Sequence, residues 1–240
     1  MISISEIDLD SVVREIAAPV PEPEPTQELV AKCGAYLERR GWTKAVAGEA
    51  DFQAAALVLA KCNVRKRCGI FVFGDYGCGK TAFLNAIKPI FAPVHFVPLN
   101  KPEYAEMLNI DDWPNWNADA MKCSVMLDDL GAESAQSDYG VKREYAAEFV
   151  VRFHQEGQGR LFVTTNLTGE AIAERYTARF TSRIKELCIP FHLKGSDKRK
   201  WGPAVPASRL AVGTADAASC RSQSVSRPPL EAGTASGGEA

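Results

Sequence analysis

The segment Gly74–Thr81, G-D-Y-G-C-G-K-T, constrains the fold more than any other stretch of the chain. It matches the phosphate-loop pattern G-x-x-x-x-G-K-[ST] at every position. The apolar run Ile70–Phe73 precedes it, and the helix-compatible run Ala82–Lys88 follows it. A strand, a glycine-rich turn and a helix are the context that this pattern requires, because the N–H groups of the turn and the helix N-terminus then face a phosphate. We therefore predict a nucleotide-binding loop.

The residues of this loop are candidate ligands for ATP and Mg²⁺. Lys80 is expected to place its charge on the β- and γ-phosphates, and Thr81 to supply a hydroxyl ligand for Mg²⁺. A thiol at a helix N-terminus has a lowered pKa, so we expect alkylating agents to modify Cys78 and ATP to protect it, with a shielded thiol as the alternative. The predicted nucleotide ligands are Gly74, Asp75, Tyr76, Gly77, Cys78, Gly79, Lys80, Thr81 and Ala82.

The rest of the core alternates apolar strands with helical segments. Such alternation predicts an α/β fold with a parallel sheet and right-handed crossovers. Pro98 ends the second strand and indicates that this strand lies at an edge of the sheet. The five predicted strands are Ile70–Phe73, Val94–Pro98, Cys123–Gly131, Leu161–Asn166 and Ile189–Leu193, and the helices between them include Pro102–Leu108, Pro114–Lys122, Gly140–Gln155, Gly169–Tyr176 and Ala178–Leu187.

Polar side chains follow two of these strands where each strand ends. Asp128 and Asp129 close the third strand, and Asn166 closes the fourth. Ligands of open parallel sheets bind beyond the carboxyl ends of the strands. Asp128 is expected to hold Mg²⁺ together with Thr81, and Asp129 to polarise the attacking water. The amide of Asn166 is expected to position that water or to contact the γ-phosphate.

Two arginines lie one turn apart on the last predicted helix. Arg179 and Arg183 flank its apolar stripe, and arginines so placed can reach the γ-phosphate held by a neighbouring subunit. Spacing alone favours an ordinary solvated helix face. For single-stranded DNA, Lys142 and Arg143 are weak candidate contacts, and the basic connector Arg65–Arg67 is the alternative. The net charge of −2 means that any nucleic-acid contact must come from such a local patch.

The predicted core spans residues 26–200 and has helices at its N-terminal end. Thr26 is a candidate N-cap for the first helix, which is expected to end at Gly41. Residues 1–25 are acidic and rich in proline, and residues 201–240 are rich in Ala, Ser, Gly and Pro, so we predict both to be disordered. The chain shows no secretory signal and no apolar run long enough to span a membrane. Seven cysteines without a C-x-x-C pair fit a cytoplasmic protein.

Five blocks, in order, carry a resemblance to a known family. They are G-D-Y-G-C-G-K-T, V-M-L-D-D-L-G-A-E, L-F-V-T-T-N-L, R-F-T-S-R-I and L-K-G-S-D-K-R. From about Arg65 to Arg199 the chain resembles the AAA+ ATPases of the DnaC type, which load replicative helicases, and their relative IstB, a helper of transposition. The block D-D-L-G-A-E is the most characteristic of the five.

The resemblance implies a role for each matching residue. Lys80 and Thr81 match Walker A, and Asp128 and Asp129 match Walker B, with Asp129 where other AAA+ proteins often carry glutamate. Asn166 matches sensor 1. Arg183 matches the arginine finger of box VII, with Arg179 as its companion, and Arg199 matches a basic residue after the last strand. The resemblance also implies a P-loop NTPase core without a separate C-terminal lid domain.

The implied activity is ATP hydrolysis coupled to assembly on a replicative helicase and single-stranded DNA, with self-association through the arginine finger. One alternative is an IstB-like helper that delivers a transposase to DNA. The other is a nucleotide-gated adaptor with negligible turnover. Only about 60 residues precede the region of resemblance and they hold no zinc-binding cysteine set, which departs from the loaders and leaves the protein partner open between helicase and transposase.

Overall fold

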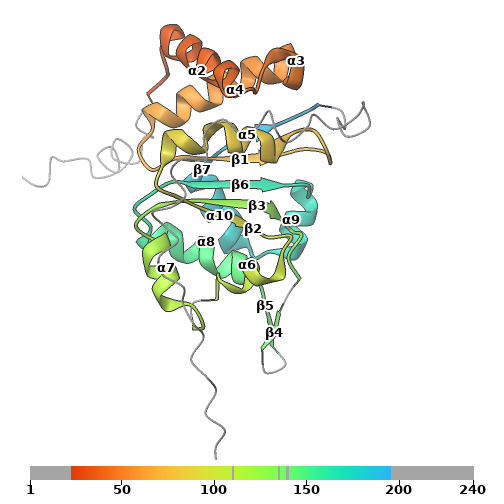
Figure 1. The fold of residues 1–240 in the computed structure, drawn as a ribbon. Coiled ribbons are helices and arrows are strands. Elements are labelled where there is room, and N and C mark those ends of the chain that lie inside the picture. The colour runs from red at the N-terminus through yellow and green to blue at the C-terminus, as the bar shows by residue number, and fades with distance from the viewer. Residues whose placement is uncertain (1–22, 110, 135, 139–140, 196–240) are drawn as a thin grey trace, which may run out of the picture. The chain divides into compact units, whose positions relative to one another are not determined.

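The computed structural model describes residues 23–109, 111–134, 136–138 and 141–195 of the chain. Its core is a sheet of five parallel strands in the order β2-β3-β6-β1-β7 (Figure 1). The predicted α/β fold with a five-stranded parallel sheet is therefore confirmed. The strands are β1 (Gly69–Phe73), β2 (Val94–Pro98), β3 (Ser124–Leu130), β6 (Leu161–Thr165) and β7 (Cys188–His192).

Burial on both faces explains why the central strands are almost continuous apolar runs. Every residue of β6 is buried, as are the first four residues of β1. Parallel strands are covered by helices on both faces, so their sequences lack the alternation of a half-exposed strand. Strand β2 lies at the edge, as Pro98 predicts, and only Val97 of its five residues is buried.

One face of the sheet is covered by the helix before β1 and the helix after it, and two further N-terminal helices pack on the outer side of the helix before β1 (Figure 1). The ring of Trp42 links them, because its centroid lies 5.2 Å from that of Phe83 and 6.1 Å from that of Phe52. Thr26 caps the first helix as predicted, its hydroxyl accepting from the Leu29 N–H at 3.2 Å. These helices are α2 (Gln27–Arg39), α3 (Lys44–Ala47), α4 (Glu49–Val64) and α5 (Lys80–Ile87), with the 3-10 helix η2 (Lys88–Phe91) after α5.

The opposite face is covered by the helices that follow the other strands. Helix α10 packs against α8, and Phe153 and Phe180 are fully buried between these helices and the sheet. The crossover after β1 thus runs over one face, while those after β3 and β6 run over the other. This divergence opens a crevice at the carboxyl ends of the strands. The helices of this face are α6 (Pro102–Glu106), α7 (Pro114–Ala120), α8 (Tyr145–Glu156), α9 (Gly169–Arg175) and α10 (Ala178–Leu187).

The segment between β3 and α8 differs from the prediction. A helix from about Gly140 is wrong, because α8 begins at Tyr145 and an antiparallel hairpin of β4 (Gln136–Asp138) and β5 (Val141–Arg143) precedes it. The apolar helical spacing starts only at Tyr145, and a glycine at position 140 disfavours a helix there. The hairpin extends away from the sheet (Figure 1).

Both predicted disordered segments lie largely outside the described residues, as does Arg199. The described ranges end at Gly195, so the predicted span of the core, residues 26–200, stays a prediction. None of the described helices is long and apolar enough to cross a membrane.

Candidate functional site

The loop Gly74–Thr81 joins β1 to α5, as predicted. Gly74, Gly77 and Gly79 have φ angles of 152°, 75° and 107°, which L side chains rarely adopt. At Gly74 there is also no space, because a Cβ atom would lie 2.2 Å from the carbonyl oxygen of Leu193. The glycines of the motif are therefore required by the path of the backbone.

Lys80 opens α5, and its side chain is folded back under the loop. Its Nζ donates to the carbonyl oxygens of Gly74 and Asp75 at 2.9 and 2.8 Å and to Oδ1 of Asn166 at 2.6 Å. Only 5% of the residue is exposed. A buried ammonium group is tolerated only when its donors are paired, and these three oxygens pair all of them.

Thr81 and Asp128 face each other across the floor of the site. The Thr81 hydroxyl lies 3.0 Å from both carboxylate oxygens of Asp128, and the Thr164 hydroxyl donates to Oδ1 of Asp128 at 2.6 Å. Burial raises the pKa of the Asp128 carboxyl, against the hydrogen bonds from Thr164 and Thr81. A hydroxyl and a carboxylate so close together are hard oxygen ligands that suit Mg²⁺.

Asp129 points a different way from Asp128 because the backbone turns between them. Its φ angle is 63°, and the register of β3 against β6 shifts between Leu127 and Leu130. A non-glycine residue in this region costs about 1–3 kcal/mol, so the surroundings must hold it there. One such contact is the hydrogen bond from the Asp129 N–H to the Thr164 hydroxyl at 2.8 Å. The turn sends Asp128 toward Thr81 and Asp129 into the crevice.

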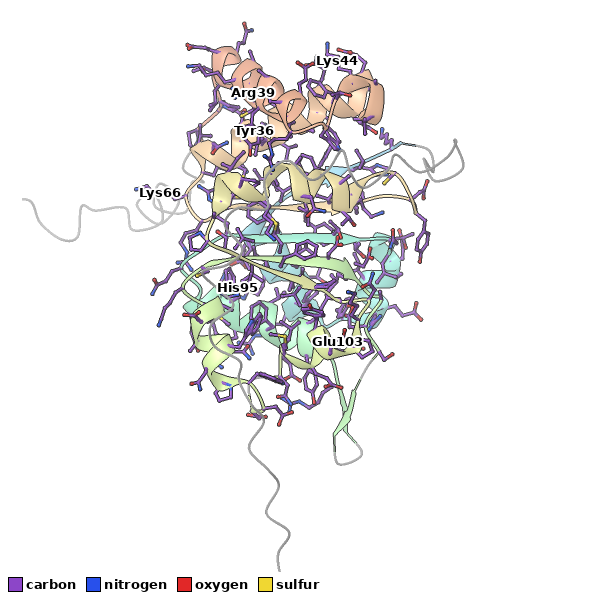
Figure 2. The ribbon with its side chains drawn as sticks, viewed as in Figure 1. Tyr36, Arg39, Lys44, Lys66, His95 and Glu103 are labelled. Atoms are coloured by element: carbon purple, nitrogen blue, oxygen red, sulfur yellow. The ribbon has the colours of Figure 1, made fainter. Side chains whose placement is uncertain are left out.

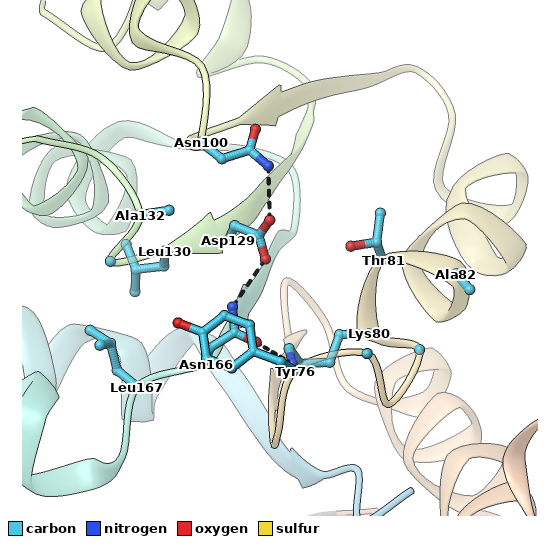
Figure 3. A pocket seen from close by; sticks show the side chains of 13 residues that line it. Tyr76, Lys80, Thr81, Ala82, Asn100, Asp129, Leu130, Ala132, Asn166 and Leu167 are labelled. Carbon is cyan, nitrogen blue, oxygen red and sulfur yellow. Dashed lines mark hydrogen bonds between the residues drawn. The ribbon is translucent and has the colours of Figure 1, made fainter. Parts of the chain in front are cut away.

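The side chain of Asn166 connects the ammonium group of Lys80 to the carboxylate of Asp129. Its Oδ1 accepts from Lys80, while its Nδ2 lies 3.4 Å from Oδ1 of Asp129. On the other side, Nδ2 of Asn100 donates to Oδ2 of Asp129 at 3.0 Å. Figure 3 shows these three hydrogen bonds as one chain that runs from Asn100 to Lys80. Both oxygens of the Asp129 carboxylate thus accept from carboxamides.

Several of these side chains border a cavity of about 520 Å³ at the carboxyl edge of the sheet, whereas Asp128 and Thr164 lie behind Thr81 and Asp129 and are not among its lining residues. That volume falls within the range of small-molecule and cofactor sites. Four segments line it, from the loop after β1, the end of β2, the end of β3 and the end of β6. The lining residues are Tyr76, Gly77, Gly79, Lys80, Thr81, Ala82, Asn100, Asp129, Leu130, Gly131, Ala132, Asn166 and Leu167.

Three predicted nucleotide ligands do not line the cavity. Gly74 and Asp75 contribute carbonyl groups to Lys80 instead, and Cys78 is fully buried, with its Sγ 3.7 Å from Nζ of Lys80. An inaccessible thiol does not meet an alkylating agent, so the burial of Cys78 favours the alternative of a shielded thiol. Tyr76, in contrast, is 69% exposed at the mouth of the cavity.

The two arginines of α10 are not among the residues that line this cavity. Nη1 of Arg183 pairs with both carboxylate oxygens of Glu186, at 2.7 and 3.0 Å. The same carboxylate contacts Nε2 of His154 at 2.7 Å, and this contact is the main reason why the pKa of Glu186 is lowered. The structure therefore does not bring Arg183 to Lys80 or Asp129 of its own chain.

The residues predicted to contact single-stranded DNA have different surroundings from those expected. Lys142 and Arg143 belong to β5, not to a helix, and the Arg143 guanidinium pairs with Asp111 at 3.3 Å and with Glu148. Two carboxylates offset its charge, which weakens Arg143 as a phosphate contact. In the alternative connector, Figure 2 shows Lys66 pointing outward from the segment before β1, and the residue is exposed.

Sequence reasoning missed Asn100, Thr164 and the buried acid Glu133. Asn100 follows the end of β2, so the rule that identified Asn166 applies to it equally. Thr164 lies inside an apolar strand and carried no separate signal. Glu133 is the last residue of the characteristic block D-D-L-G-A-E, but nothing in its spacing shows that it is buried.

No family model matches the chain, and a search of curated proteins finds no similar sequence.

Proposed function

We propose that this chain is a P-loop ATPase of the AAA+ type that binds Mg²⁺–ATP in the cavity beside Gly74–Thr81 and hydrolyses it. One observation carries the proposal: five polar side chains from three separate segments meet at one edge of the sheet, namely Lys80 and Thr81, Asp128 and Asp129, and Asn166. Electrostatic stabilisation and positioning supply most of the catalysis of phosphoryl transfer, and these residue types serve both.

Lys80 is the group that would bind the β- and γ-phosphates. Its present acceptors are two carbonyl groups of the loop and the Asn166 amide. Phosphate oxygens carry more charge than these acceptors and make stronger hydrogen bonds with an ammonium group. Binding of ATP would therefore draw Nζ upward from the loop carbonyls and release Oδ1 of Asn166.

Thr81 and Asp128 would hold the magnesium ion, directly or through water. When bound there, Mg²⁺ would supply positive charge that offsets the negative charge of the phosphates. Release of Asn166 from Lys80 would free its amide to orient the attacking water. Asp129 would accept the proton of that water, because its carboxylate faces the cavity and lies next to Asn166.

The proposed partners rest on the five-block resemblance alone. They are a replicative helicase, with a transposase as the alternative, together with single-stranded DNA and a second copy of the chain that accepts Arg183. The proposed location is the cytoplasm, and the AAA+ core is proposed to lack a separate C-terminal lid. Capture of binding proteins with the purified chain would separate helicase from transposase.

A nucleotide-gated adaptor with negligible turnover is the second candidate, and one contact favours it. Both carboxylate oxygens of Asp129 already accept from Asn100 and Asn166. An attacking water must compete with these two amides for the oxygens of Asp129 before it can give up a proton there. If ATP does not displace these amides, the chain would bind nucleotide without hydrolysing it.

A steady-state ATPase assay with and without single-stranded DNA separates the two candidates. Asp129→Asn should retain ATP binding, while its turnover number should fall roughly 10²- to 10⁴-fold, the range for general acid–base groups. Asp119→Asn, a change at an exposed acid on α7, is the matched control and should behave as wild type. Wild-type binding with no measurable turnover under either condition would replace the ATPase by the adaptor.

A further inference from the structure

Glu133 is a carboxylate in a place where water cannot solvate it. Its side chain is 3% exposed, and it lies in the segment that follows Asp128 and Asp129. Oε2 accepts from the N–H of Gly131 at 2.7 Å, and Oε1 accepts from the hydroxyl of Tyr176. A buried carboxylate is destabilising unless such donors surround it, so this site is built around the acid.

Arg175, the last residue of α9, completes the arrangement. Its guanidinium donates to the carbonyl oxygens of Gly131 and Glu133, and Nη2 lies 3.4 Å from Oε1 of Glu133. It also pairs with Glu144, which precedes α8, at 3.0 Å. One planar cation thus joins the segment after β3, the residue before α8 and the end of α9. We call Glu133, Arg175 and Glu144 the arginine clamp.

The arginine clamp acts on the turn that aims Asp129. Gly131 is held through both its N–H and its carbonyl group, two residues after Asp129. Gly131 itself has a φ angle of 97°, and a Cβ atom there would lie 2.4 Å from Cδ1 of Leu167. The Ala132 N–H closes the turn by donating to the carbonyl oxygen of Asp129 at 2.9 Å. Thr164 fixes one side of Asp129, and the clamp fixes the other.

We propose that Glu133 and Arg175 are positioning residues that hold the carboxylate of Asp129 in the cavity by fixing the peptide groups of Gly131. The kinetic test of this proposal rests on the proposed ATPase function, whereas the structural test, by hydrogen exchange, does not. Neither residue lines the cavity. Their effect on catalysis must therefore pass through Asp129, and not through contact with nucleotide.

The kinetic test uses Arg175→Lys, which keeps the charge and loses the planar fork that reaches several acceptors at once. Misplacement of a catalytic group by about 1 Å can cost 10²-fold, so we expect kcat to fall roughly 10- to 100-fold. The Kd of Mg²⁺–ATP should change less than about twofold, since Lys80 and Thr81 are untouched. Arg152→Lys is the control, because Arg152 pairs with Glu156 on the exposed side of α8.

A double variant decides whether the effect passes through Asp129. In an Asp129→Asn background, Arg175→Lys should cause no further loss of kcat, because residues that act as a unit are not additive. The same fold loss in both backgrounds would overturn the proposal. Tyr176→Phe, which removes one donor to Glu133, gives a milder version of the same test if Arg175→Lys fails to fold.

Amide hydrogen exchange tests the clamp without any nucleotide. In Arg175→Lys the peptide that covers residues 127–134 should exchange at least about tenfold faster than in wild type, while the peptide that covers β1 is unchanged. Unchanged exchange at residues 127–134 overturns the clamp even if ATP is hydrolysed. If exchange is faster but the wild-type protein binds no ATP, the proposed function and the catalytic role of the arginine clamp are both overturned. The clamp is then a structural contact only.

Discussion

The carboxyl edge of the sheet and the outer face of α10 both carry charged side chains, but they hold them differently. At the sheet edge, Lys80 and Asp128 are 5% and 4% exposed, and each is paired with several polar atoms. On α10, the side chains of Arg183 and Glu186 are 30% and 47% exposed, and they pair with one turn of helix between them.

This difference indicates what each region can do. Buried charges are destabilising when unpaired, so Lys80 and Asp128 keep their polar partners until oxygen atoms of a ligand replace them. Exposed ion pairs contribute only about 0–1 kcal/mol, so Arg183 can leave Glu186 at little cost for a stronger acceptor. A pre-formed binding site and a releasable cation are what an ATPase that is completed by a second subunit requires.

The largest effect is expected for Arg183→Ala. If Arg183 acts on ATP held by a neighbouring subunit, turnover should fall by as much as roughly 10³–10⁵, while the isolated subunit keeps its ATP affinity. Steady-state hydrolysis across a protein concentration series measures this, with Arg152→Ala as the control for loss of an exposed arginine.

Mixing variants gives the sharper form of this prediction. Arg183→Ala lacks the finger and Lys80→Ala lacks the binding site, so a mixture of the two forms junctions with one intact site and one intact finger. The mixture should regain part of the lost activity. If mixing restores no ATPase activity while both variants stay folded, Arg183 does not act on a neighbouring subunit. The difference between the two regions then has no role in catalysis.

A smaller effect is expected for Asn100→Ala at the sheet edge. Removal of its hydrogen bond frees Oδ2 of Asp129 to accept from the attacking water, so basal turnover should rise roughly two- to tenfold, as for loss of one competing hydrogen bond near solvent. Asn85→Ala, at an exposed position of α5, is the control. A fall in turnover would show that Asn100 orients Asp129 instead of restraining it.

The smallest effect concerns the pH dependence of stability. Burial raises the pKa of Glu133 above its ordinary value of 4.5, against the hydrogen bond from Tyr176. Between 4.5 and the raised pKa the folded state binds more protons than the unfolded state, so the free energy of unfolding falls as pH rises. Glu133→Gln should remove this part of the slope, which urea unfolding at a series of pH values measures. An identical slope in wild type and variant would contradict the shift.

Much of the sheet could be predicted because its strands carry a simple signal. β1, β3 and β6 are buried runs bounded by glycine or polar residues, and residues at their carboxyl ends converge in any parallel sheet. Lys80, Asp129 and Asn166 could therefore be grouped from the order of residues along the chain. Whether they bind ATP remains a prediction.

The remaining features depend on contacts between segments far apart in the chain. The β4–β5 hairpin is short, and a strong helical pattern follows it directly. The pairing of Glu133 with Arg175 joins residues 42 positions apart, and the burial of Cys78 depends on how the loop folds over it. Local propensity and periodicity carry no information about such contacts.

The nucleotide site is tested most directly by the affinity of the isolated chain for Mg²⁺–ATP, measured by calorimetry on wild type, Lys80→Ala and the control Lys32→Ala, which alters an exposed lysine of α2. Hydrogen bonds to charged groups contribute about 1.5–3 kcal/mol, so Lys80→Ala should weaken binding roughly 10- to 100-fold, while Lys32→Ala leaves it unchanged. Wild-type affinity in folded Lys80→Ala, or no binding by wild type, would contradict the assignment of the cavity as a nucleotide site.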